Sequence, residues 1–198
     1  MTERELHNEE LSTFLYASIA DIQSTIRATD TKVAALLVIL IIPATHLDDI
    51  YKVCKKLCDH PSCRVAQDFI LAGAVIFALS WILAFFASAR TLMGVYNPAR
   101  QISGKTPHGS FYSGGLFRFS FLDIFTNQQR RSKTTLESHI TNFPKMNAEL
   151  VAELTFEQMK LAYIRDVKGF RQTAAFACAI AWITLGACGW ICALFLGL

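Results

Sequence analysis

Basic side chains are the residues of this sequence best suited to ligand chemistry, and most of them fall in one stretch. Of the 19 Lys and Arg residues, twelve lie between Arg90 and Arg171. An anionic ligand is bound well by arginine and by backbone N–H donors. We therefore name Arg118, which alternates with aromatic residues, as the first candidate anion contact, followed by Arg100 and Lys105. A solvated surface arginine is the competing interpretation of Arg118.

Residues 99–106 (Ala-Arg-Gln-Ile-Ser-Gly-Lys-Thr) match the relaxed spacing of a phosphate-binding P-loop, with alanine in the first glycine position. That loop requires a strand before it and a helix after it, because the amides of the helix N-terminus hold the phosphates. Here an apolar helix precedes the motif, and Pro107-His-Gly follows it. We therefore do not expect a nucleotide-binding P-loop.

A cluster of cysteines lies in the loop between the first two apolar runs. Cys54, Cys58 and Cys63 are accompanied by His46 and His60. The spacing lacks the paired two-residue gap of a zinc knuckle, so we predict no metal site. If the loop is external, one disulfide with one thiol left over is possible, and free thiols are an equally good interpretation.

The sequence contains no recognisable catalytic set. The five histidines are scattered, and neither a His-x-x-x-His pair nor a Gly-x-Ser-x-Gly motif is present. Glu149, Glu153 and Glu157 recur every four residues, which is typical of a solvated helix face rather than of acid–base chemistry. We predict that the protein is not an enzyme and carries no cofactor.

The elements that must position these residues are membrane-spanning helices. The chain is 53% hydrophobic and only 18% charged. The runs Phe69–Ala89 and Gln172–Leu198 carry no charge, and each exceeds the roughly 20 residues that a spanning helix needs. Val33–Leu47 is shorter, but Lys32 can extend its ammonium to the headgroups, and Pro43 is tolerated in a membrane helix. We predict three spans.

The predicted fold is a mainly α membrane protein with three transmembrane helices, an N-terminal amphipathic helix and a small cytoplasmic segment that contains a short β element. One face before the first span recurs at three- and four-residue steps and is apolar except for Ser18: Leu11, Phe14, Leu15, Ser18, Ile22 and Ile26. Such a helix can lie on the membrane or pack on a partner helix, and the second role is the commoner one. The predicted segments are the amphipathic helix (1–30), the first span (31–50), an external loop (51–67), the second span (68–90), the cytoplasmic segment (91–170) and the third span (171–197).

Within the cytoplasmic segment, residues 117–121 alternate between aromatic and polar, which predicts a strand. Residues 134–140 suit a short helix, and a long helical pattern runs from Met146 towards the third span. Basic residues border the spans on this side at Arg90, Lys168 and Arg171, and such residues prefer the cytoplasm. The N-terminus is therefore predicted inside and the C-terminus outside, although four basic residues of the external loop oppose this orientation: Lys52, Lys55, Lys56 and Arg64.

The order of several short motifs resembles the Pycsar effector transmembrane family, the PycTM-like proteins of bacterial anti-phage defence. The motifs are Ala28-Thr-Asp-Thr-Lys32 at the start of the first span, Asn97-Pro98 after the second, the aromatic strand at 117–121, Glu157-Gln158 and Lys168-Gly-Phe170. The Asp-Thr-Lys step, with Asp30 and Lys32, matches best. The chain departs from the family pattern at Ala35, at Gly169 and over residues 103–115.

This resemblance implies a membrane effector in the bacterial inner membrane. A partner nucleotidyl cyclase would make cyclic CMP or cyclic UMP after infection, and the effector would impair membrane integrity so that the cell aborts the infection. The implied partners are the lipid bilayer and this cyclic pyrimidine nucleotide as activating ligand, and no nucleic acid is expected. The alternative function is a passive membrane anchor or scaffold that recruits a partner through its basic cytoplasmic segment.

The charged residues at the start of the first span need partners. Because Asp30 and Lys32 are two positions apart, they do not face each other on one helix. Asp30 is expected to pair with Arg165 or Lys168, and Lys32 with Asp166 or a lipid phosphate. Simple interfacial anchoring is the competing interpretation.

The third span has the composition for close helix contact. Small residues stand four apart at two places, Ala175 with Ala179 and Gly189 with Ala193, and this spacing lets helix backbones approach in lipid. Because three spans cannot enclose an aqueous path, we expect a homo-oligomer assembled through this span. The competing interpretation is that these residues pack the third span against the first two within one chain.

Overall fold

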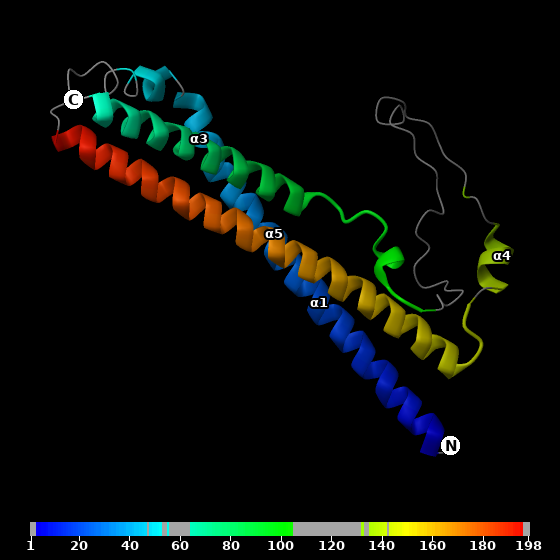
Figure 1. Cartoon of the computed structure of the whole chain (residues 1–198). Helices are drawn as coiled ribbons and strands as arrows, with labels where there is room; N and C mark the ends of the chain where they lie inside the picture. Colours follow the sequence, from blue (N-terminus) through cyan, green and yellow to red (C-terminus); the bar gives the residue numbers. More distant parts are fainter. Residues whose placement is uncertain are drawn as a thin grey trace. The chain divides into compact units, whose positions relative to one another are not determined.

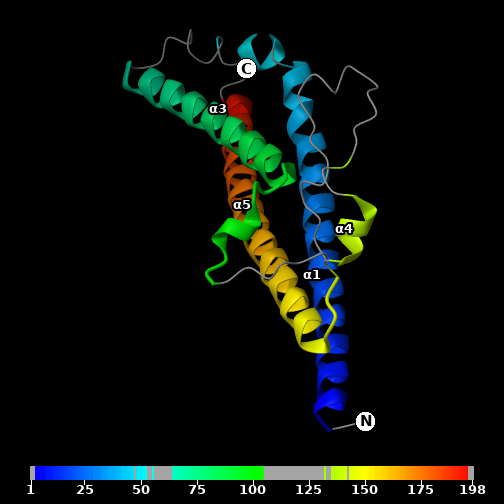
Figure 2. The same cartoon turned by 90° about the vertical axis from the view of Figure 1, so that its right-hand side faces the viewer.

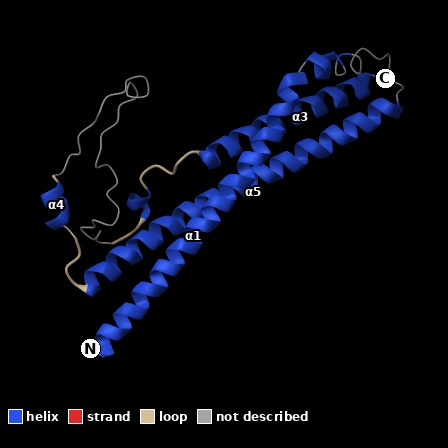
Figure 3. Cartoon of the chain, turned by 180° about the vertical axis from the view of Figure 1, so that it is seen from behind, coloured by secondary structure: helices blue, strands red, loops and turns tan. Residues whose placement is uncertain are grey.

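The computed structural model of the chain describes residues 3–46, 48–52, 55, 64–104, 132, 135–141 and 143–195. All secondary-structure elements among these residues are helices (Figure 3). In chain order they are α1 (Glu3–Ile41), the 3-10 helix η1 (Ile42–His46), α3 (Arg64–Leu92), the 3-10 helix η2 (Pro98–Gln101), α4 (Leu136–Thr141) and α5 (Asn147–Phe195), as labelled in Figure 1. The strand predicted at residues 117–121 lies outside the described residues.

Three of these helices are long and apolar enough to cross a membrane. The candidate spans lie within Glu9–His46, Leu71–Leu92 and Asn147–Ile191. Only 22%, 11% and 11% of their most apolar stretches are buried inside the molecule. Apolar surface on this scale is unfavourable in water and favourable against lipid tails. The protein is therefore a mainly α, multi-pass membrane protein, as the sequence predicts.

Helix α1 continues without a break from the amphipathic segment into the first span. Its α-helical part ends at Ile41 because Pro43 has no N–H for the carbonyl of Ile39 and disfavours α-helical geometry in the residue before it. The chain continues as η1. Val33–Ile41 rises roughly 14 Å at about 1.5 Å per residue, and η1 adds roughly 10 Å at about 2.0 Å per residue. Lys32, just before this stretch, is exposed, so its long side chain is free to extend towards the headgroups.

The described chain divides into two compact units. Unit 1 comprises Met1–Ser24 and Asn97–Ile164, and unit 2 comprises Thr25–Tyr96 and Arg165–Leu198. Helices α1 and α5 each contribute residues to both units, whereas α3 belongs to unit 2.

In unit 1, α1 packs along α5 in a parallel direction. The buried residues Leu15, Ile19 and Leu154 form the core, with partly buried apolar residues around them. One polar contact joins the same helices, from Gln158 Nε2 to Ser18 Oγ at 2.7 Å. Phe14, which belongs to the predicted apolar face, is exposed. The stripe that packs on α5 continues through Ile19 instead.

Two local features of unit 1 follow from its sequence. A short helix predicted at residues 134–140 is present as α4, Leu136–Thr141. The Glu149 side chain accepts a 2.9 Å hydrogen bond from the Lys145 N–H at the start of α5. A carboxylate there satisfies a free donor and opposes the positive end of the helix dipole.

In unit 2, the three helices form a small bundle in which α3 returns antiparallel to α1 and α5 (Figure 2). The core contains Leu36, Leu40, Ala84, Ala175 and Ala179. Buried positions on α1 recur at alternating steps of four and three residues, at Thr29, Val33, Leu36 and Leu40. This heptad spacing is typical of helices that pack by inserting side chains between those of a neighbour.

Candidate functional site

An ion pair joins α1 to α5 in unit 2. Lys168 Nζ donates to Asp30 Oδ1 at 2.5 Å. The lysine side chain is only 8% exposed, whereas the aspartate side chain is 37% exposed. Pairing of Asp30 with a basic residue of the long helix is thus confirmed, and Lys168 is the partner.

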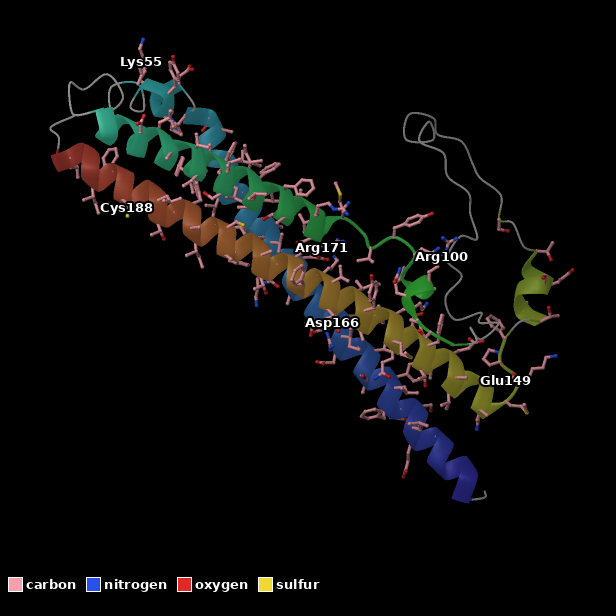
Figure 4. The ribbon with its side chains drawn as sticks, in the orientation of Figure 1. Lys55, Arg100, Glu149, Asp166, Arg171 and Cys188 are labelled. Carbon is pink, nitrogen blue, oxygen red and sulfur yellow. The ribbon has the colours of Figure 1, made fainter. Side chains whose placement is uncertain are left out.

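Arg171 makes a second cross-helix contact one turn further along α5. Its Nη1 donates at 2.8 Å to the carbonyl oxygen of Arg90, in the last turn of α3 (Figure 4). The last carbonyls of a helix lack partners within the helix and form the negative end of its dipole. A guanidinium there satisfies one carbonyl and opposes that charge. Lys168 and Arg171 therefore tie α5 to α1 and to α3.

Buried hydroxyl groups accompany these contacts. Thr29 on α1 and Ser88 and Thr91 on α3 are all buried. Thr91 Oγ1 donates to the Ala87 carbonyl at 2.8 Å, whereas Ser88 Oγ is buried without a hydrogen-bond partner. We call the six residues Thr29, Asp30, Ser88, Thr91, Lys168 and Arg171 the polar layer. It marks one end of the bundle in unit 2.

Aromatic side chains pack the bundle further along its helices. Trp81 Nε1 on α3 donates to the Leu40 carbonyl at 2.8 Å. Phe77 lies 5.9 Å from Trp182, measured between ring centroids. A Cβ atom added to Gly186 would lie 3.1 Å from the Phe77 ring, so this glycine makes room for the aromatic side chain.

The other charged residues predicted at the start of the first span are arranged differently. Lys32 is exposed. Asp166 pairs with its neighbour Arg165, whose Nη2 lies 3.0 Å from Asp166 Oδ1. The carboxylate predicted as a partner of Lys32 is therefore engaged on its own helix, and contact of Lys32 with a lipid phosphate stays a prediction.

Of the three predicted anion contacts, only Arg100 lies among the described residues. It is exposed in the last turn of η2, and Figure 4 labels it. Asn97 precedes this turn with φ 49° and ψ 59°, a left-handed conformation that asparagine tolerates, and Pro98 follows at the first helical position. Lys105 and Arg118 lie outside the described residues. The P-loop-like motif follows the helix α3 rather than a strand.

The small residues of the third span divide into two groups. Ala175 and Ala179 are buried against Leu36 and Ala84 within the chain. Gly189 is exposed, and an added Cβ would meet nothing within 4 Å. The Ala193 side chain lies outside the described residues. Ala175 and Ala179 thus pack α5 against the other helices of the same chain, whereas Gly189 has open space beside it.

Two of the three glutamates predicted on a solvated face of α5 are not solvated, which corrects that prediction, whereas Glu149 is exposed. Glu153 and Glu157 are buried, and so is Lys160, which forms an ion pair with Glu157. Lys160 Nζ also lies 5.3 Å from the centroid of the Phe156 ring. Spacing alone could not reveal this, because it does not show which helix face is covered.

Among the described residues, no group of three His, Cys, Asp or Glu side chains could hold a metal ion. Cys54, Cys58 and Cys63 lie outside the described residues, so their state stays open. Cys178 and Cys188 are free thiols. No family model, curated protein or solved structure matches the chain.

Proposed function

We propose that this protein is a membrane effector of a cyclic-pyrimidine-nucleotide signalling system in anti-phage defence. Cyclic CMP or cyclic UMP, made by a partner cyclase, would activate it to impair the bacterial inner membrane and abort infection. The order of motifs from Ala28 to Phe170 supports this assignment, and Asp30 and Lys168, which belong to those motifs, form an ion pair between two helices.

The observation that carries the proposal is the sharing of α1 and α5 between two units. Both helices run unbroken from unit 1 residues into the apolar residues of unit 2. A segment that binds a ligand needs a covalent connection to the spans, and α1 and α5 each supply one. Ligand binding in unit 1 would therefore move or twist the helices that the polar layer fastens together.

The proposed orientation places unit 1 in the cytoplasm and the end of α5 outside. Arg27, Arg90 and Arg165 stand at the end of the spans nearest unit 1 in the sequence, which suits a cytoplasmic location. In a variant lacking all six cysteines, Tyr96→Cys should resist an impermeant thiol reagent in intact cells, and Lys52→Cys should react. The reverse pattern contradicts this orientation.

The function is tested in cells that express the protein with or without a pyrimidine nucleotidyl cyclase. We expect phage infection to depolarise the membrane and reduce phage yield only when both proteins are present. A cyclase made inactive by substitution is the control for expression burden. A chain that localises to the membrane and binds partner proteins, but never depolarises cells, would instead be the passive scaffold.

The ligand contacts proposed on residue type are Arg118, Arg100 and Lys105. Binding of radiolabelled cyclic CMP or cyclic UMP to detergent-solubilised protein tests each alanine variant. We expect the largest loss for Arg118→Ala, because arginine can give two parallel hydrogen bonds to one phosphate. Lys52→Ala, which changes a basic residue outside the predicted cytoplasmic segment, is the matched control.

A further inference from the structure

The ion pair between Asp30 and Lys168 is unequal in its exposure to solvent. The lysine is nearly enclosed by the bundle, whereas more than a third of the aspartate side chain is exposed. Water or headgroups can hydrate Asp30 if its partner is lost, but they cannot reach Lys168 in this packing. Loss of Asp30 therefore leaves an uncompensated charge in the bundle, which is far more unfavourable than loss of an exposed partner.

The packing around the pair makes this end of the bundle easier to rearrange than the other end. Its buried residues on α3 are the small Ser88 and Thr91, whereas Phe77 and Trp81 fill the positions further along the same helix. A buried polar atom without a hydrogen-bond partner occurs at both ends, Ser88 Oγ here and Trp182 Nε1 beside Phe77. The difference between the two ends therefore rests on the size of their buried side chains.

We propose that the Asp30–Lys168 ion pair is the latch that holds the bundle in its resting packing. When the latch is broken, the buried Lys168 ammonium must reach solvent or headgroups, and α5 must separate from α1 at the polar layer. This separation is the step that activation by a ligand would trigger. The inference rests on the proposed function for its readout, but not on the identity of the ligand.

The latch is tested by dye release from vesicles of anionic phospholipid that carry the purified full-length protein, without nucleotide. Asp30→Asn should raise the release rate at least about tenfold, since a population shift of that size needs little more than 1.4 kcal/mol. Lys168→Gln should raise it less, because Asp30 remains hydrated. The double variant should return towards the wild-type rate, because no unpaired charge remains.

Arg165→Gln is the matched control. It removes a cation three residues from Lys168 whose ion pair with Asp166 is exposed, and such pairs contribute little. Its release rate should equal that of the wild type. Release by Arg165→Gln as fast as by Asp30→Asn would show that any lost charge at this end suffices, which overturns the latch.

Insertion into the vesicles and thermal unfolding are measured for every variant. An inserted, folded Asp30→Asn protein that stays silent, while wild type releases dye with a cyclic nucleotide, overturns the latch and leaves the proposed function standing. If Asp30→Asn releases dye but the wild type releases none with any nucleotide, the latch is supported and activation by a cyclic nucleotide is refuted. If Asp30→Asn fails to insert, the test is made with Lys168→Gln. Dye release by Lys168→Gln at the wild-type rate then overturns the latch.

Discussion

The indole Nε1 of Trp81 donates a 2.8 Å hydrogen bond to the carbonyl oxygen of Leu40, where α1 gives way to η1. In a 3-10 pattern this carbonyl would pair with the residue three positions on, which is Pro43 and has no N–H. In lipid no water replaces a missing donor. Trp81 therefore satisfies a backbone group that the proline would leave free.

Replacing Trp81 by phenylalanine removes this donor and keeps an aromatic ring. We expect Trp81→Phe to destabilise the protein by about 0.6–1 kcal/mol, the usual size of such a hydrogen bond. Thermal unfolding in detergent measures the change. Trp190→Phe is the control, because Trp190 is 66% exposed; equal shifts for the two variants would show that the Leu40 contact contributes nothing.

Gly186→Leu should destabilise the bundle by about 1–3 kcal/mol, the typical cost of overpacking. The added Cβ alone would lie 3.1 Å from the Phe77 ring, and the rest of the leucine has no space. Gly189→Leu on the same helix meets open space and should not destabilise it. Unfolding midpoints compare the two; a stable Gly186→Leu protein contradicts the packing of Phe77 against this glycine.

Gly189→Leu should instead weaken self-association, since an exposed glycine is where a second helix can approach closely. Crosslinking in native membranes should give fewer oligomers for this variant than for wild type. Cys188→Leu adds bulk at the neighbouring exposed position and is the control for a nonspecific effect. Unchanged oligomers in Gly189→Leu would move the interface elsewhere. Ala179→Leu cannot serve here, because Ala179 packs inside the chain.

Lys160→Met should destabilise unit 1 strongly, by about 3–5 kcal/mol, because it leaves the buried Glu157 carboxylate without its ion-pair partner. Lys52→Met breaks an exposed pair with Asp49 and should cost less than about 1 kcal/mol. Denaturation in detergent separates the two variants. Similar small losses would mean that water reaches Glu157 in the native protein.

Much of the helical framework could be predicted from the sequence, because long apolar runs and charge placement follow directly from the lipid environment. The pairing of Asp30 with a base on α5 was also predictable, since a carboxylate at a membrane boundary needs a partner. Residue spacing alone could not tell that Phe14, on the apolar face, is exposed, and it predicted that Glu153 and Glu157 are solvated, whereas they are buried. The burial of these residues depends on which neighbouring helix covers each face, and the sequence of a single helix does not show that.

The small residues of α5 show the same limit. Ala175, Ala179 and Gly189 are all small residues of the same predicted spacing pattern, yet the first two pack within the chain and the third is exposed. The roles of Trp81 and Gly186 were not predicted either. The proline near the end of the first span could have indicated that a carbonyl there lacks a backbone donor, but not that Trp81 supplies one.

The central claim is most directly tested by dye release from vesicles that carry only the purified protein. Cyclic CMP, cyclic UMP and, as a control of equal charge, cyclic AMP are added separately. A membrane effector of cyclic pyrimidine nucleotides should release dye with one of the first two and not with cyclic AMP. Release that is absent with all three nucleotides, from protein shown to be inserted and folded, would contradict the account.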